Sequence, residues 1–266
     1  MTMNPHNQSR RAFTLPEIMI VATIFGLVMA GVLPFFIFNL KSQYVAEQKL
    51  LINGDIRKVT NQMVEYARES NTFVIYQAFA AQNRWDGVAE TRDADGNSAI
   101  NFFDRQQNGS SGDFMVLIYY TDPYFNTLLY DGNASNNPTI TSGVVSRMVG
   151  YWIAPNRRFP GENAVYSFDT DTYKGAGATW STSWGATFPA TLSSTVTFES
   201  LLPPATTAYS QATEFPILLN NLSGLSNGYT FYNYQNKSII TKAKILHGNQ
   251  AKRVTNTYNF TITPRG

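Results

Sequence analysis

The stretch that decides the fold lies near the amino terminus, where residues 13–38 read FTLPEIMIVATIFGLVMAGVLPFFIF. From Ile18 to Phe38 this stretch holds 21 residues without a charge. A helix of about 20 apolar residues, rising ~1.5 Å per residue, is long enough to cross the hydrocarbon core of a bilayer. The sequence therefore predicts a membrane-spanning helix over residues 18–38.

The segment before this apolar run has the features of a targeting leader. Residues 1–12, MTMNPHNQSRRA, are polar, contain no acid and carry two adjacent arginines just before the apolar run begins. On the other side of the predicted span, Lys41 and Lys49 are mixed with Glu47. Because basic residues favour the cytoplasmic side of a membrane, we expect a cytoplasmic leader and an exported chain after residue 40.

The helical period of apolar residues continues beyond the predicted span. Apolar side chains recur at spacings of seven, four, three, four and three, and charged residues mostly occupy the other positions. The members of this face are Val45, Ile52, Ile56, Val59, Met63 and Tyr66. We expect one helix from about Thr14 to about Glu69, with an apolar first half and a second half that lies on a domain.

Three residues weaken this predicted helix. Gly26 and Gly31 lower the helix propensity, and Pro34 removes one intrahelical hydrogen bond. We therefore expect a kink or a melted turn near Pro34.

The start of the helix carries an explicit signal. Thr14 and Glu17 have the T-x-x-E spacing of a capping box, and Pro16 falls in the first turn, where its missing N–H leaves no bond unmade. One interpretation is that Glu17 serves only as a helix cap. However, an acid at the edge of an apolar segment is costly in a membrane, which favours a functional partner for the carboxylate.

With these residues in view, the stretch from Arg11 to Phe38 resembles the amino-terminal signature of type IV prepilins and of type II secretion pseudopilins. In that family a short basic leader is cut before a phenylalanine that opens F-T-L-x-E, and the new amine is methylated. The resemblance implies cleavage between Ala12 and Phe13 and N-methylation of Phe13. Glu17 matches the family's glutamate, and Pro34 matches its helix-kinking proline.

Two positions depart from the family pattern. Ala12 replaces the usual leader glycine, and Pro16 occupies a site that is normally aliphatic. The resemblance further implies a prepilin peptidase and methyltransferase, other pilin or pseudopilin subunits and an inner-membrane assembly platform as partners. It implies a single-pass protein of the bacterial inner membrane that later enters a periplasmic or extracellular filament.

An ordinary secretory signal is the competing interpretation of the amino terminus. Val28-Met29-Ala30 satisfies a loose small-x-small rule, which would give cleavage after Ala30 and a soluble exported protein. This alternative does not explain why Glu17 lies inside the apolar region. It would also leave the apolar run Val32–Phe38 at the new amino terminus of a soluble protein.

The rest of the chain, residues 70–266, is predicted to be a β-rich head domain. Seven runs rich in β-branched and aromatic residues indicate strands: Thr72–Phe79, Asp113–Tyr120, Ser146–Ile153, Ala164–Phe168, Tyr229–Tyr234, Lys237–Leu246 and Arg253–Thr263. Residues 234–237 predict a tight turn, and the last run predicts one buried face. We expect an α+β, pilin-like fold in which the long helix packs on an antiparallel sheet.

Long segments rich in Gly, Ser, Thr, Asn and Pro separate the predicted strands. They are Gln82–Gln107, Asp122–Thr141, Pro155–Asn163 and Thr170–Ser210. Segments of this length and composition are expected to be surface insertions, and any recognition by the head domain is expected to reside there.

Composition excludes several kinds of chemistry. The chain has 266 residues, no cysteine and two histidines, which leaves no thiolate nucleophile, no disulfide and no multi-histidine metal centre. Its formal charge of +2 is too close to balance to indicate nucleic-acid binding. With 43% hydrophobic residues the chain can bury a core.

Two motifs resemble functional sites weakly. Residues 224–228 fit G-x-S-x-G, but no Asp or Glu follows Glu214, so a turn is the better interpretation, and His247 is expected to be an exposed strand-end residue. Asp93, Asp95 and Asn97 alternate as in a calcium loop, although the glycine comes too early and no Glu closes the loop. No cofactor is expected apart from this candidate calcium site, for which a polar turn is the competing interpretation.

Two classes of function remain. The favoured one is a non-enzymatic filament subunit, a minor or specialised one given its length and loops, assembled through the apolar helix. Val28, Gly26 and Gly31 are expected to lie at contacts between helices, and Glu17 to pair with the new amine of its own or the preceding subunit. The alternative is a membrane-tethered or secreted hydrolase or carbohydrate-binding protein with a similar leader.

Overall fold

The fold is given by a computed structural model of the chain. It describes residues 13–79, 105–121, 143–155, 163–171, 188–193, 196, 198–202, 224–226, 229–249 and 252–265. The chain divides into two units, Met1–Glu47 and Gln48–Gly266, and each is described by itself.

The helix α1 runs from Leu15 to Glu69 without a break. Its bounds lie close to those expected from the apolar period, since only the first residue differs. Pro34 lies inside the helix, and the helical backbone continues through it, so of the two alternatives, a kink or a melted turn, the melted turn was wrong. Proline removes one hydrogen bond but its fixed φ is helical, and the many bonds on either side keep the segment in register.

In the first unit, α1 exposes its apolar side chains. Between Leu15 and Leu40 the large apolar residues other than Met29 are about half exposed or more, from Ile37 at 49% to Leu15 at 74%. By length and composition, α1 is the described helix that could cross a membrane. An apolar surface this continuous is stable only when lipid or other apolar side chains cover it.

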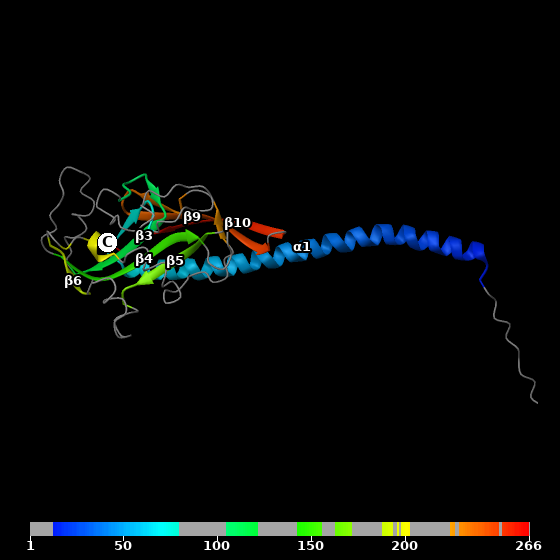
Figure 1. The fold of residues 1–266 in the computed structure, drawn as a ribbon, viewed down its shortest axis with the longest axis horizontal. Helices are drawn as coiled ribbons and strands as arrows, with labels where there is room; N and C mark the ends of the chain where they lie inside the picture. The colour runs from blue at the N-terminus through cyan, green and yellow to red at the C-terminus, as the bar shows by residue number, and fades with distance from the viewer. Residues whose placement is uncertain are drawn as a thin grey trace, which may run out of the picture. The chain divides into compact units, whose positions relative to one another are not determined.

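The second unit combines the last part of α1 with ten strands and a short 3₁₀ helix (Figure 1). The strands in chain order are β1 (Thr72–Tyr76), β2 (Ser111–Gly112), β3 (Phe114–Tyr120), β4 (Val144–Pro155), β5 (Asn163–Asp169), β6 (Ala190–Thr191), β7 (Gly224–Ser226), β8 (Phe231–Tyr234), β9 (Ser238–Asn249) and β10 (Lys252–Ile262). The 3₁₀ helix η2 is Glu199–Leu201. The predicted α+β fold, a long helix followed by an antiparallel sheet, is confirmed.

All strand pairs are antiparallel, and they form two groups. In the first group the order is β1-β3-β4-β5, with β6 paired to the start of β4. In the second group β9 pairs along its length with β10 and, on its other side, with β8 and β7 in turn. The groups are joined where β5 pairs with β7, and β2 pairs with β8 at the end of the second group.

The two faces of the first group have different partners. Side chains alternate between the faces of a strand, and Tyr119 of β3 and Arg147 of β4 point towards α1. The helix contributes Ile52, Val59, Met63 and Ala67 as its buried residues. Ile56 and Tyr66 are partly buried and Val45 is exposed, so the expected helix face holds only in its central part.

The opposite face of the sheet carries an aromatic core. Tyr76, Phe114, Trp152 and Phe168 pack there with Phe79. The same cluster includes Ala190, Leu192, Phe198, Leu201 and Leu202. The prediction that Thr170–Ser210 is a surface insertion was therefore wrong for the described residues 190–193, 196 and 198–202, where sparse apolar side chains cover the sheet.

Three local predictions can be compared with the structure directly. Residues 234–237 form the expected tight turn between β8 and β9, with Gln235 and Asn236 at φ of 54° and 53°. Residues 224–226 of the G-x-S-x-G stretch form strand β7 instead of a turn, because Leu225 pairs with Ile245 of β9. On β10, Val254 and Ile262 are buried, as expected for a strand with one buried face.

Candidate functional site

The amino-terminal site lies at the first turn of α1. Phe13, the expected first residue of the mature chain, is 80% exposed. Glu17 accepts two hydrogen bonds at its Oε2 atom, from the backbone N–H and from the hydroxyl of Thr14, both at 2.9 Å. The carboxylate thus caps the helix end and lies one turn from Phe13, close to where cleavage would create a positive amine.

The apolar half of α1 offers surfaces for close contact with another helix. Val28 is 53% exposed. A Cβ atom added at Gly26 or at Gly31 would meet no heavy atom within 4 Å. Small residues beside exposed branched ones allow helix backbones to approach closely in an apolar environment.

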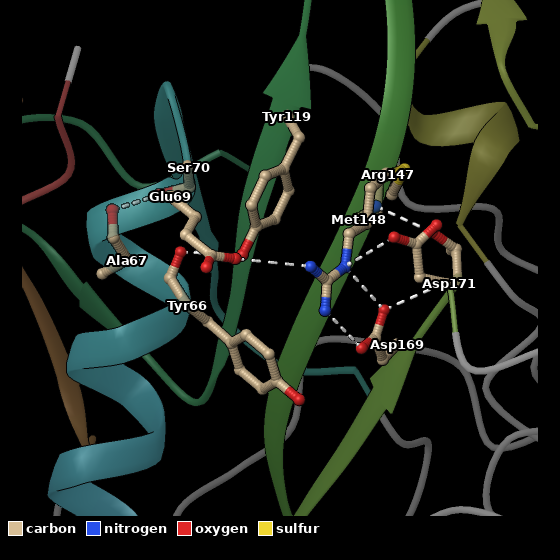
Figure 2. A network of polar contacts seen from close by, with 10 residues as sticks. Tyr66, Ala67, Glu69, Ser70, Tyr119, Arg147, Met148, Asp169 and Asp171 are labelled. Carbon is tan, nitrogen blue, oxygen red and sulfur yellow. Dashed lines mark hydrogen bonds and ion pairs between the residues drawn. The ribbon is translucent and has the colours of Figure 1, made fainter.

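A second site joins the end of α1 to the sheet, and its centre is Arg147 of β4 (Figure 2). The Arg147 guanidinium donates from Nε to Asp169 Oδ1 at 2.9 Å and from Nη2 to Asp169 Oδ2 at 2.6 Å. Asp171 and Glu69 add carboxylate oxygens at 3.5 and 3.6 Å. The hydrogen bonds of Asp169 are the main reason that the pKa of Arg147 is raised, so this cation stays charged.

Two tyrosine rings complete the surroundings of the guanidinium. The carbon at the centre of the guanidinium lies 5.0 Å from the ring centroid of Tyr66 and 4.9 Å from that of Tyr119. Tyr119 also donates its hydroxyl to the backbone carbonyl of Tyr66 at 2.7 Å. Burial raises the pKa of Tyr119, so this hydroxyl stays protonated as a donor.

These contacts satisfy the carboxyl end of α1. Ser70 donates its backbone N–H to the Tyr66 carbonyl at 3.0 Å and its hydroxyl to the Ala67 carbonyl at 2.9 Å. The last carbonyls of a helix lack intrahelical donors, and a cation such as Arg147 is favourable near them. The cluster therefore fixes where α1 ends on the sheet.

A buried ion pair lies beside the aromatic core on the other face. Arg105 donates to Glu199 Oε1 from Nε and from Nη2, both at 2.6 Å, and Tyr76 donates its hydroxyl to the same oxygen at 3.1 Å. The arginine and glutamate side chains are 10% and 6% exposed. This pair attaches η2 to the edge of β1, because Arg105 also forms a β-bridge with Tyr76.

Several sequence candidates are not brought together. Ala12 and the calcium candidates Asp93, Asp95 and Asn97 lie outside the described residues. Within the described part of the chain, no group of three or more His, Asp or Glu side chains could hold a metal ion. His247 lies within β9, opposite Val254 of β10.

Sequence reasoning missed both charged clusters. Arg147 lies within the predicted run Ser146–Ile153, and Asp169 directly follows the run Ala164–Phe168. A charge within a buried strand usually has a partner, so this signal was available in the sequence. The identity of the partner was not, because it depends on how β4 and β5 are aligned.

Comparison with known proteins gives one match. The model of the prokaryotic N-terminal methylation motif matches residues 7–33, which include the leader end, Phe13, Glu17 and most of the apolar run. No curated protein and no solved structure matches the chain. The match coincides with the capped first turn and the exposed apolar half of α1.

Proposed function

We propose that this chain serves as a non-enzymatic subunit of a type IV pilus or of a type II secretion pseudopilus. The premise is that the chain carries a type IV pilin-like amino-terminal signature and is a pilin-like substrate of prepilin peptidase. The observation that carries the proposal is the continuity of the methylation motif with α1. The motif ends at residue 33, and the helix continues unbroken into the sheet unit at Glu69.

The proposed processing site lies between Ala12 and Phe13. Cleavage there removes the leader and leaves Phe13 as the free and then methylated amino terminus. The apolar half of α1 then anchors the chain in the inner membrane, with the β-rich unit outside the cytoplasm. On assembly the lipid contacts of this half are exchanged for contacts with the helices of neighbouring subunits.

Glu17 is proposed to neutralise the new amine. A positive charge that enters a filament core of low dielectric needs a counter-charge, since an unpaired buried ion is costly. The Glu17 carboxylate already lies 2.9 Å from the Thr14 nitrogen, one residue after Phe13. It is therefore placed to pair with the amine of its own chain or with that of the preceding subunit.

A minor or specialised role is the most consistent with the size of the β-rich unit. The unit spans residues 48–266, which include the last part of α1. The proposed partners are the prepilin peptidase and methyltransferase, other pilin-like subunits and the inner-membrane assembly platform.

Substitution of Val28 by arginine tests assembly directly. We expect Val28→Arg to be processed and retained in membranes but to be absent from sheared filaments, because a charge cannot enter the packed helix core. Asn61→Arg, at an exposed position of the second half of α1, is the matched control and should assemble normally. Normal incorporation of Val28→Arg would mean that α1 is only a membrane anchor.

A further inference from the structure

The strand β10 forms a long edge of the second group of strands. It pairs with β9 over its whole length, from Lys252 opposite Asn249 to Ile262 opposite Ile239. Among the described residues, no strand pairs with the other side of β10. An unpaired edge presents a row of backbone donors and acceptors that fits another extended chain.

The backbone hydrogen bonds of β9 show which backbone N–H and C=O groups of β10 point to its open edge. Lys242 of β9 donates its N–H to Thr230 at 2.8 Å, on the side away from β10. Because backbone groups alternate along a strand, Thr241 and its odd-numbered neighbours point towards β10. Their partners in register are even-numbered, Phe260 being opposite Thr241. The odd-numbered residues of β10 therefore direct their N–H and C=O groups to the open edge: Arg253, Thr255, Thr257, Asn259 and Thr261.

The residues of this edge lack the features that normally protect one. From Val254 to Ile262 there is no charge, no proline and no glycine. Natural edge strands are usually interrupted by such residues, which prevent unwanted pairing. The only charges on β10 are Lys252 and Arg253 at its start.

Two aromatic rings beside the edge are incompletely covered. Tyr258 and Phe260 point to the same face of β10, with ring centroids 4.8 Å apart, and each is only partly buried. The Tyr258 hydroxyl is hydrogen-bonded to that of Thr60, so this face is the one that faces α1. A strand added to β10 would place alternate side chains next to these rings.

The direction of β10 excludes antiparallel pairing with the same edge of a second copy. Tyr258 contacts Thr60, and Arg265 beyond the strand end donates its N–H to Ser70, so β10 and α1 run in the same direction (Figure 1). Antiparallel pairing of two β10 edges would reverse α1 in one copy. Subunits anchored in one membrane and assembled in one filament share a polarity, so an antiparallel strand added to β10 comes from a different segment of a neighbour.

We propose that the edge of β10 binds an extended segment of a neighbouring pilin-like subunit by strand addition. This inference rests on the proposed function, since it takes the neighbour from the filament. The outward residues from Thr255 to Thr261 define a partner segment of about seven residues. The segment is uncharged along Val254–Ile262 and carries apolar side chains towards Tyr258 and Phe260.

Photo-crosslinking in assembled filaments tests the proposal. A benzoylphenylalanine is placed singly at Thr257, Asn259 or Thr261, and at exposed Lys242 of β9 as the control. We expect adducts with one extended segment of a neighbouring subunit, shifted by two residues between successive positions, and no adduct with that segment from Lys242. Adducts that are absent, or scattered over unrelated segments, from subunits that assemble normally would overturn the strand addition.

Substitution of the edge backbone provides the second measurement. Asn259→Pro removes an outward N–H without touching the β9 ladder, whereas Asn259→Ser keeps that N–H. We expect incorporation into filaments to fall about tenfold for the proline variant alone, the effect of losing one or two main-chain hydrogen bonds. Equal incorporation of both variants would contradict the proposal. If the unmodified chain is never processed or never enters filaments, the proposed function itself fails.

Discussion

Arg147 and Asp169 come from neighbouring strands and are joined by two parallel hydrogen bonds, of 2.9 Å from Nε and 2.6 Å from Nη2. Around this pair the last turn of α1 is attached to the sheet through Tyr66 and Glu69. The pair therefore attaches the carboxyl end of α1 to β4 and β5, through residues that are adjacent only after folding.

Two replacements of Arg147 should distinguish the contribution of its charge to stability from the contribution of its planar geometry. Arg147→Met leaves the carboxylate of Asp169, whose side chain is only 9% exposed, without its cation and is expected to lower the free energy of unfolding by about 3 kcal/mol. Arg147→Lys keeps the charge but loses the planar two-pronged contact and should cost about 1–2 kcal/mol. Urea unfolding of the detergent-solubilised chain measures both. A lysine variant as stable as the unmodified chain would show that charge alone suffices.

The same substitution at two glycines should have opposite effects. A Cβ atom at Gly112 would lie 2.0 Å from the Tyr76 carbonyl oxygen, so Gly112→Ala must displace backbone and should destabilise by about 3 kcal/mol. Gly54 lies inside α1 with no heavy atom within 4 Å of such a Cβ. Gly54→Ala should stabilise by about 0.5–1 kcal/mol, because alanine favours the helix. Thermal unfolding of both variants measures these effects. A Gly112→Ala variant as stable as the unmodified chain would contradict the close approach of β1 and β2.

Stability should decline at high pH partly through Tyr258. Burial raises the pKa of Tyr258 to about 12, and the hydrogen bond with Thr60 acts in the opposite direction. In the unfolded chain the pKa is about 10, so the unfolded state loses its proton first. The contribution of Tyr258 to the free energy of unfolding is complete below pH ~10 and is lost as the pH rises to ~12. Thermal unfolding midpoints between pH 8 and 12 should fall less steeply for Tyr258→Phe, and identical slopes would exclude this role.

The helix and the main strands were predictable because each has a local period. Apolar residues at helical spacing locate α1, and β-branched runs locate β3, β4 and β9. The short strand β7 was missed because it begins at Gly224 and pairs over only three residues. Its place depends on β9, which lies later in the chain.

The candidate sites were predictable to different extents. The Thr14–Glu17 contact is set by residues three apart, so the sequence contains it. The pairing of Arg105 with Glu199 joins residues 94 positions apart, and the covering role of Phe198 and Leu201 depends on that attachment. Composition identified that segment only as rich in Ser and Thr, since its apolar residues are too few to form a periodic pattern.

Charge and capping at Glu17 can be distinguished by two substitutions. Glu17→Gln keeps the shape and much of the cap, whereas Glu17→Ala removes both cap and charge. We expect both variants to be cleaved and to reside in the membrane but to incorporate poorly into filaments, as immunoblots of membrane and sheared fractions would record. Normal assembly of Glu17→Gln together with loss of assembly in Glu17→Ala would show that capping is what matters.

The most direct measurement is the mass of the amino-terminal peptide of the membrane-bound chain, produced together with a prepilin peptidase. The account predicts a mature chain of 254 residues, the 266 of the full sequence less the 12 of the leader, with 18 Lys+Arg left after loss of Arg10 and Arg11 against 18 Asp+Glu. Its first residue should be N-methylated Phe13. A chain that keeps Met1, or one that begins at Gly31 after an ordinary signal cleavage, would contradict the account.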